Sequence, residues 1–447
     1  MHSTHDAMNT LKDDKDSSVG YRHILAKNWR DIGLGLVLSL GIAVASYQLS
    51  ISLPAFLMQT EDLWFHADQN KVSQVMSSRE TQHHIGNRNR RHPLFPLLTF
   101  VPVYLIKHGL SVDQTTALRV FSAAVVSVWI GVFFALLRLI GCRRPDAALF
   151  TLLASSSASS IFWFIIPESF GLGSLSLLCA FVLVALAEST KLASGWYVAA
   201  NALSFSVTTT NWMAGILSVL VTYHWKRALR LMLYAVCLVT GLWLVQKALI
   251  PAWPFFFPNL EQEATWLLRS DSGGPFHVVR AFLFHSMVMP TIATDDRTPA
   301  AVLVEGHYVQ LGPYFTIQGS SLGSGTAWGL FAAVFWAGLL LMGAWAWFQL
   351  KQHGRFRIML GIALLGQLML HLFYGNETFL YSLHFMPLLI LLAAASTLTR
   401  ARPIALALAA LLVMAALMNN IIVFQQAGSM ARDAYRHSQA EQILPIQ

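Results

Sequence analysis

Charged residues are scarce in this sequence. They account for 12% of its 447 residues, whereas hydrophobic residues account for 55% and the mean hydropathy is +0.54. A composition this apolar excludes an ordinary soluble domain. Apolar runs of about 20 residues recur along the chain, and each is long enough to cross a bilayer as a helix. The sequence therefore predicts a polytopic, all-α membrane protein.

Cysteine is also scarce, and nucleotide-binding motifs are lacking. The three cysteines, Cys142, Cys179 and Cys237, follow no disulfide or metal-binding spacing. The sequence has no Gly-x-x-x-x-Gly-Lys-Ser/Thr loop, no Gly-x-Gly-x-x-Gly after a strand and no His-Glu-x-x-His. These absences argue against a nucleotide bound by a soluble domain and favour an activated substrate that resides in the membrane. We interpret the net charge of +8 through the two sides of a membrane rather than as a nucleic-acid-binding surface.

The apolar runs predict about 11 transmembrane helices. The first follows a charged tail at 1–31 and lacks a small-residue cleavage site, so we expect it to be retained rather than removed as a signal peptide. The apolar segment 94–106 is too short to span a bilayer and contains Pro96 and Pro102, so we expect a helix lying in the membrane interface. The expected spans are 33–57, 116–140, 146–166, 169–190, 195–210, 211–225, 228–250, 326–349, 355–375, 378–398 and 403–424.

Lysine and arginine decide the expected orientation of these spans. With the N-terminal tail in the cytoplasm, the short cytoplasmic loops are basic and most of the acids lie on the other side. The basic loops lie around Arg143, Lys191, Lys226, Lys351 and Arg400. This bias predicts a multi-pass protein of the cytoplasmic (inner) membrane, with its functional face on the outer, periplasmic side.

The same topology divides the chain into regions. We expect a transmembrane module at 32–250 with a first outer loop at 58–93, a large outer loop at 251–325, C-terminal transmembrane helices at 326–424 and an outer tail at 425–447. The large loop lacks helical periodicity and is long for a connection, which is typical of a functional segment. It is interpreted either as a lid, with Arg280 and His285 reaching a ligand, or as a passive packing element.

Polar residues are concentrated in the first outer loop. It holds four carboxylates, four histidines and four arginines in about 35 residues, and such dense polarity in an apolar protein indicates a functional site. Other polar residues lie at the outer ends of expected spans, namely Glu168, Asn211, Glu377 and His384. An ionised carboxylate at a span end is costly without a partner or water, so Glu168 favours a cavity-lining role, with a buried ion pair as the alternative. For Asn211 the alternative is a helix cap.

A first span, an acidic loop, a His-Pro-Leu element at 92–94 and the basic turn GCRRPDAA follow one another in the first part of the chain. This order resembles the GT-C superfamily of polytopic glycosyltransferases, which includes the protein O-mannosyltransferases and the aminoarabinose transferases of lipid A. The resemblance covers about residues 33–215. Two features depart from the family pattern. The family's pair of adjacent acids occurs here only as Glu61-Asp62, whereas the acid in the sequence context most similar to the family is the single Asp68. The second proline of the family's His-Pro-Pro element is replaced by Leu94.

The resemblance implies a glycosyltransferase that moves a sugar, with inversion, from a polyprenyl-phosphate donor to a lipid, glycan or protein acceptor. Such a reaction needs a carboxylate that accepts the proton of the acceptor hydroxyl, and cations that hold the leaving phosphate. The candidate catalytic carboxylates are Asp68 first, then Asp62 and Glu61. The candidate substrate-binding residues are Arg79, Arg91, His92, Glu168, Asn211, Glu377 and His384.

The participation of a metal and the class of function both have alternatives. The resemblance is compatible with a divalent ion such as Mg²⁺ or Mn²⁺, for which Glu168 and His84 are the candidate ligands. The arginines have a second interpretation, as contacts to anionic lipid headgroups. The acids of the first outer loop likewise have a second interpretation, as solvated side chains. The alternative function is a transporter or flippase, but such proteins place polar residues near mid-membrane, where this sequence has few.

Overall fold

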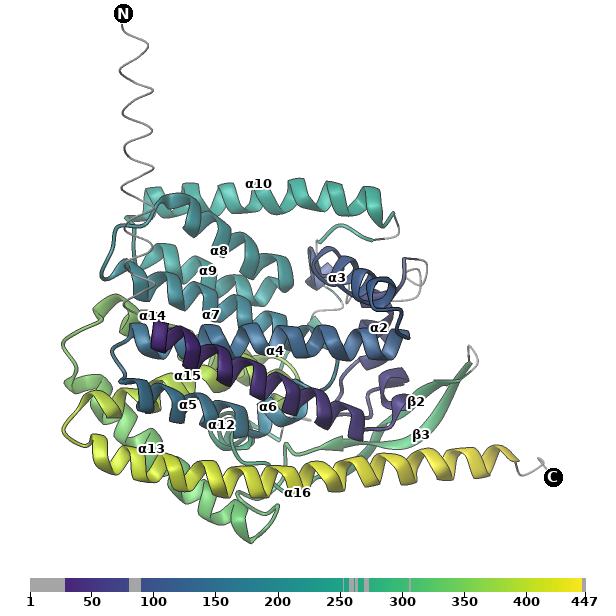
Figure 1. Cartoon of the computed structure of the whole chain (residues 1–447). Coiled ribbons are helices and arrows are strands. Elements are labelled where there is room, and N and C mark those ends of the chain that lie inside the picture. The colour runs from purple at the N-terminus through teal and green to yellow at the C-terminus, as the bar shows by residue number, and fades with distance from the viewer. Residues whose placement is uncertain are drawn as a thin grey trace, which may run out of the picture.

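The computed structural model describes residues 29–79, 90–251, 253–256, 261, 264–268, 273–304 and 307–443. This part of the chain is mostly helical (Figure 1). By length and composition, eight of its helices could cross a membrane, as expected of a multi-pass membrane protein. They are Trp29–Ser52, α4 (Gln114–Leu139), α7 (Ser169–Ala187), α10 (Trp225–Leu249), α13 (Ala327–Gln349), α14 (Gly354–Phe373), the segment Thr378–Leu398 that contains α15 (Ser382–Ala394), and α16 (Arg402–Ile443).

The three remaining expected spans form shorter helices, so the count of 11 is not confirmed. Ser157 interrupts one of them because its backbone is extended and its hydroxyl accepts a hydrogen bond from the Ser160 N–H, which starts a new helix. Thr208 is likewise extended and separates the other two. The shorter helices are α5 (Arg144–Ser156) and α6 (Ala158–Trp163) within 146–166, α8 (Ser194–Val207) within 195–210, and α9 (Trp212–Leu220) within 211–225.

The segment expected to lie in the interface forms α3 (Phe95–Gly109). It has 15 residues and an internal proline, Pro102, and it is not among the helices long enough to span. Gln246 of α10 holds its start, because the side-chain amide donates to the Pro93 carbonyl and accepts from the Leu97 N–H, each at 3.0 Å. The short length agrees with the expectation of a helix that does not cross the membrane.

A three-stranded antiparallel sheet is a feature that the all-α expectation did not include. It consists of β1 (Thr60–Glu61), β2 (Ala293–Val304) and β3 (His307–Thr316), in the order β1-β2-β3. The β2-β3 hairpin comes from the large outer loop, which also contains the short helix α12 (Pro275–Arg280). β1 has two residues and pairs with β2 across more than 200 positions, a contact that no local pattern reports. β2 and β3 form a local hairpin, but a search for apolar spans does not register strands in a polar loop.

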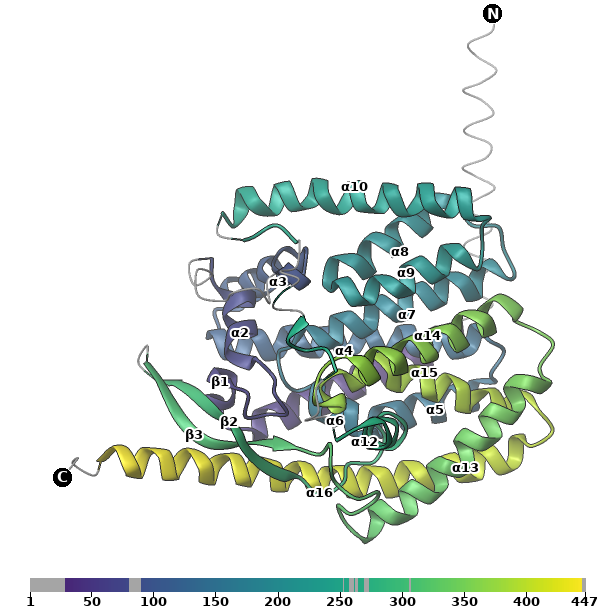
Figure 2. The same cartoon turned by 180° about the vertical axis from the view of Figure 1, so that it is seen from behind.

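The C-terminal segment 425–447 was expected to be an outer tail separate from the last transmembrane helix, but its described residues are not separate. They continue α16, which is 42 residues long and runs beside the hairpin in both views (Figures 1 and 2). The Tyr435 ring stacks on Phe56 with centroids 4.2 Å apart, and the Ser438 hydroxyl donates to the Gln310 carbonyl at 2.8 Å. The end of α16 therefore supports the sheet.

The sheet, α2 (Gln69–Ser77) and α3 gather at one end of the helical bundle (Figure 2). An aromatic cluster fastens the first outer loop to that end. Trp64 and Phe65 are fully buried, and their rings contact Phe162 of α6, Phe315 of β3 and Phe379 before α15. Edge-to-face aromatic pairs of this kind stabilise a core beyond the burial of their apolar surface. The acidic loop is thus anchored to three other parts of the fold.

Candidate functional site

A cavity of about 440 Å³ lies where the first outer loop, the start of α7, the turn between α8 and α9, and the adjoining ends of α14 and α15 meet. Cavities of this size are typical of small-molecule sites. Six of the residues predicted from the sequence line it together: Asp62, Asp68, Arg91, His92, Asn211 and His384. The structure therefore brings acids, cations and neutral polar groups from distant parts of the chain to one cavity.

The loop that carries Asp62 has an unusual backbone. Asp62, Phe65 and His66 all have positive φ angles, of 63°, 54° and 61°. For residues other than glycine this region is unfavourable, and it persists only where the surrounding structure imposes it. The burial of Phe65 and a hydrogen bond from the Asp62 N–H to the Ala67 carbonyl impose it here. The loop therefore holds Asp62 and His66 in fixed positions at the cavity.

The two candidate aspartates have different partners. Asp68 Oδ1 lies 3.2 Å from the Lys71 ammonium, which also contacts Glu61 Oε2 at 3.1 Å. Asp62 Oδ1 lies 3.5 Å from His66 Nδ1, and the Asp62 side chain is 32% exposed. Asp68 therefore shares a cation with a second carboxylate, whereas Asp62 faces the cavity beside an imidazole.

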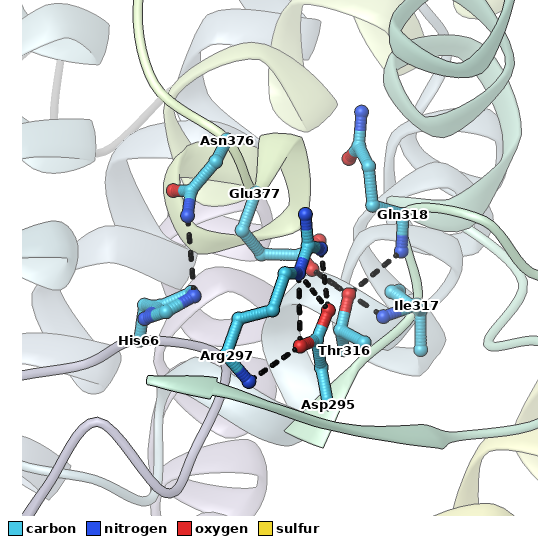
Figure 3. Close-up of polar contacts among 8 residues, drawn as sticks. All are labelled: His66, Asp295, Arg297, Thr316, Ile317, Gln318, Asn376 and Glu377. Atoms are coloured by element: carbon cyan, nitrogen blue, oxygen red, sulfur yellow. Dashed lines mark hydrogen bonds and ion pairs between the residues drawn. The ribbon is translucent and has the colours of Figure 1, made fainter. Parts of the chain in front are cut away.

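His66 is oriented by a residue from the other end of the chain. The amide nitrogen of Asn376 donates to His66 Nε2 at 3.2 Å (Figure 3), and the His66 ring packs on Tyr314 with centroids 3.7 Å apart. An Nε2 atom that accepts a hydrogen bond leaves the proton of the neutral ring on Nδ1, the atom that faces Asp62. The arrangement directs an N–H group toward the Asp62 carboxylate.

Glu61 lies in β1 and does not line the cavity. Its side chain is 7% exposed, and its carboxylate contacts both the ammonium and the backbone N–H of Lys71. Lys71 does line the cavity, although the sequence analysis did not select it. Its position three residues after Asp68, in the first turn of a helix, is the signal that could have identified it.

Cations reach the cavity from the start of the His-Pro-Leu element. His92 Nδ1 donates to the Val207 carbonyl at 2.7 Å, and the Arg91 guanidinium lies 5.9 Å from the centre of the Tyr374 ring. Arg79 is placed elsewhere, with its guanidinium 5.3 Å from the centre of the Phe100 ring, and it does not line the cavity. Arg91, His92 and Lys71 are thus three basic residues that line the cavity.

Asn211 and His384 form a buried polar part of the cavity wall. A Cβ atom on Gly173 would lie only 2.5 Å from His384 Nε2 and 2.6 Å from Asn211 Nδ2, so this glycine makes room for both side chains. Within the described ranges, the Asn211 amide and His384 Nε2 have no hydrogen-bond partner, and nor does His371 Nε2, which lines the same cavity. Buried polar atoms usually have partners, so these groups indicate a ligand-binding surface.

Glu168 and Glu377 have structural partners outside the cavity. Glu168 accepts the Ser169 N–H at 2.9 Å and caps α7. Glu377 accepts the Thr316 hydroxyl at 2.6 Å and thereby joins β3 to the segment before α15 (Figure 3). Burial raises the pKa of the Glu377 carboxyl above its ordinary value. Neither carboxylate lines the main cavity, so both are placed as supports of its walls.

The large outer loop contributes Trp266 to the cavity, whereas Arg280 and His285 do not line it. Arg280 donates to the Gln318 carbonyl at 3.4 Å, and burial lowers the pKa of His285 to about 3. Among the residues that the structure describes, no group of three or more His, Cys, Asp or Glu side chains could hold a metal ion. His84, a candidate metal ligand, lies outside the described residues.

The fold and the cavity together define a multi-pass helical membrane protein with a polar cavity at one end of its bundle. Comparison with protein-family models and with curated protein sequences gives no match.

Proposed function

We propose that the protein is a membrane glycosyltransferase of the GT-C type. It transfers a sugar from a polyprenyl-phosphate donor to an acceptor hydroxyl on the outer face of the cytoplasmic membrane. The observation that supports this proposal is one cavity that combines two aspartates and the cations Lys71 and Arg91 with buried polar groups that have no hydrogen-bond partner among the described residues. Inverting transfer from a phosphate-activated sugar requires such a combination.

In the proposed reaction the acceptor oxygen attacks the anomeric carbon while its O–H proton passes to a carboxylate. The bond between the anomeric carbon and the phosphate oxygen breaks, and its electrons leave with the polyprenyl phosphate. The guanidinium of Arg91 and the ammonium of Lys71 hold the charge that develops on that phosphate. Asn211 and His384 bind hydroxyl groups of the sugar or acceptor.

Asp62 is the preferred base in this proposal, ahead of Asp68. A base must present a carboxylate oxygen to the acceptor, and the Asp68 carboxylate is within 3.2 Å of the Lys71 ammonium. Asp62 is the more exposed of the two, at 32% against 23%, and His66 beside it can hold its orientation during proton transfer. The role of the imidazole is to position the base, as in other acid–base pairs.

The test is turnover of a panel of polyprenyl-phosphate sugars by the purified protein, measured as release of free polyprenyl phosphate. Asp62→Asn is expected to lower turnover by about 10²- to 10⁴-fold, the range for loss of a general base. Asp68→Asn is expected to lower it less, and Asp433→Asn, an exposed control at the end of α16, to leave it unchanged. Full activity of Asp62→Asn would remove Asp62 as the base.

The same preparation separates the proposal from a transporter. A transporter would release no polyprenyl phosphate from any donor in the panel but would move a solute into liposomes. That pair of results would replace the glycosyltransferase proposal.

A further inference from the structure

A second cavity, of about 500 Å³, lies at the opposite end of the bundle. It is formed by the connections between α4 and α5, α13 and α14, and α15 and α16. Helix α14 runs between the two cavities: Arg357 lines this one and His371 lines the first, so they are separated by about 21 Å along the helix axis. Residues that line this cavity have no part in the proposed transfer reaction.

The wall of this second cavity is strongly basic. Its side chains include four cations, Arg143, Lys351, Arg357 and Arg402, against one carboxylate, Asp146. Arg402 engages that carboxylate through two hydrogen bonds, of 2.9 and 2.7 Å, and Asp146 is 1% exposed. Since the acid is already paired, the remaining cations give the cavity an uncompensated positive charge.

Two of these cations lie open to a ligand. Arg143 and Lys351 are exposed, and neither forms a salt bridge within the part of the chain that the structure describes. Arg357 contributes further, because its Nε atom is buried and has no hydrogen-bond partner among the described residues. The indole nitrogen of Trp347, which also lines the cavity, is likewise buried and without a hydrogen-bond partner among the described residues. The cavity thus offers both charge and donors that the described chain leaves unsatisfied.

Three helices also begin at this cavity. Arg143 is the N-cap of α5, His353 is the N-cap of α14, and Arg402 is the first residue of α16. All three residues line the cavity. The N-terminal end of a helix carries a partial positive charge and favours anions. Carboxylates already stand at two of these ends, because Asp146 lies in the first turn of α5 and Glu188 accepts the Phe356 N–H of α14 at 3.0 Å. The positive field at the cavity therefore comes mainly from the side chains.

We propose that this cavity binds a phosphate group, supplied either by the headgroup of an anionic lipid or by free phosphate. Guanidinium and ammonium groups of the kind found here bind phosphate oxygens by charge-assisted hydrogen bonds. A basic cavity between membrane helices is also the type of site that holds acidic lipid headgroups. This site is independent of the proposed transfer reaction at the other end of the bundle.

The experiment compares two double variants with the same change in net charge. Arg143→Gln/Lys351→Gln removes the two exposed cations of the cavity, whereas Arg355→Gln/Arg400→Gln removes two exposed cations that do not line it. All four residues are exposed, so both variants should fold, which their thermal midpoints without ligand will show. Lys351→Gln alone is the second variant if the first pair lowers the midpoint.

Binding is measured by native mass spectrometry in a neutral detergent, with phosphatidylglycerol in one arm and inorganic phosphate in the other. Each cavity cation contributes on the order of a tenfold gain in affinity for a phosphate group. We therefore expect the cavity variant to bind at least tenfold more weakly and the control variant to bind within about twofold of wild type. A loss confined to the lipid arm identifies a lipid headgroup, and a loss in the phosphate arm identifies free phosphate. Equal binding by both variants and wild type in both arms overturns the proposal.

Discussion

The shared cation Lys71 offers the sharpest test of how the candidate site is held together. Its ammonium lies 3.1 Å from Glu61 Oε2 and 3.2 Å from Asp68 Oδ1. Replacing Lys71 with Met keeps a side chain of similar length and removes the charge. Two carboxylates then lie close together without the ammonium between them, and one of them is only 7% exposed.

The expected cost follows from the distance and the burial. Two unit charges about 3 Å apart attract each other by about 5 kcal/mol at an effective dielectric constant of about 20. Breaking a buried ion pair typically costs about 3–5 kcal/mol, because the remaining charge stays desolvated. Lys71 is 33% exposed, so water already screens part of the interaction. We expect Lys71→Met to lower the free energy of unfolding by about 2 kcal/mol.

The assay is equilibrium unfolding in mixed micelles, followed by tryptophan fluorescence. Glu61→Gln/Lys71→Met should recover part of the lost stability, since this double variant no longer buries an uncompensated charge. Together with Glu61→Gln alone it completes a double-mutant cycle, which measures the coupling energy between Glu61 and Lys71. Lys191→Met, at an exposed lysine, is the matched control and should change stability by less than about 0.5 kcal/mol. If Lys71→Met is as stable as this control, the ammonium does not hold the two carboxylates and the reasoning is refuted.

Three further predictions concern the walls of the cavity. Gly173→Ala places a Cβ atom 2.5 Å from His384 Nε2, so the donor KM should rise at least tenfold in the transfer assay; an unchanged KM would mean that this wall does not contact the donor. Trp64→Ala removes a fully buried ring and should lower the free energy of unfolding by about 3–5 kcal/mol. Trp196→Ala, at an exposed tryptophan, is the control, and an equal loss of unfolding free energy in the two variants would contradict the anchoring role of Trp64. Burial raises the pKa of Glu377 above its ordinary value of 4.5, so the folded state retains a proton that the unfolded state has lost. The free energy of unfolding should therefore fall as the pH rises above about 4.5, by up to about 1.4 kcal/mol per pH unit, until the pH passes the pKa of the folded state. The measurement is the thermal midpoint against pH, and parallel profiles for wild type and Glu377→Gln would contradict the prediction.

Much of the candidate site could be predicted because its acids and cations are conspicuous in an apolar sequence. Asp62, Asp68 and Arg91 were selected from the polarity of the first outer loop together with its resemblance to the GT-C pattern, and all three line the cavity. The pairing of His66 with Asn376 joins residues 310 positions apart. No local pattern reports a contact over that separation, so the orientation of His66 could not be predicted.

The supporting role of Glu168 and Glu377 was also beyond the sequence. Both are carboxylates next to apolar segments, and sequence position alone does not distinguish a cavity-lining acid from a helix cap or a strand contact. Glu168 caps α7, and Glu377 accepts the Thr316 hydroxyl from a hairpin that hydropathy did not predict. The hairpin itself is local, but its contact with Glu377 joins residues 61 positions apart and cannot be recognised before the two segments are placed.

The sequence by itself determined the class of protein, because hydropathy is a local property and eight of the long apolar segments fold as helices that could cross a membrane. It also determined where polar side chains concentrate. Only the tertiary structure decided which of those side chains meet: Asp62 beside His66, Lys71 between two carboxylates, and Arg79 away from the cavity. The physical reason is that composition and periodicity act within a helix, whereas a binding cavity depends on the packing of segments that lie far apart in the chain.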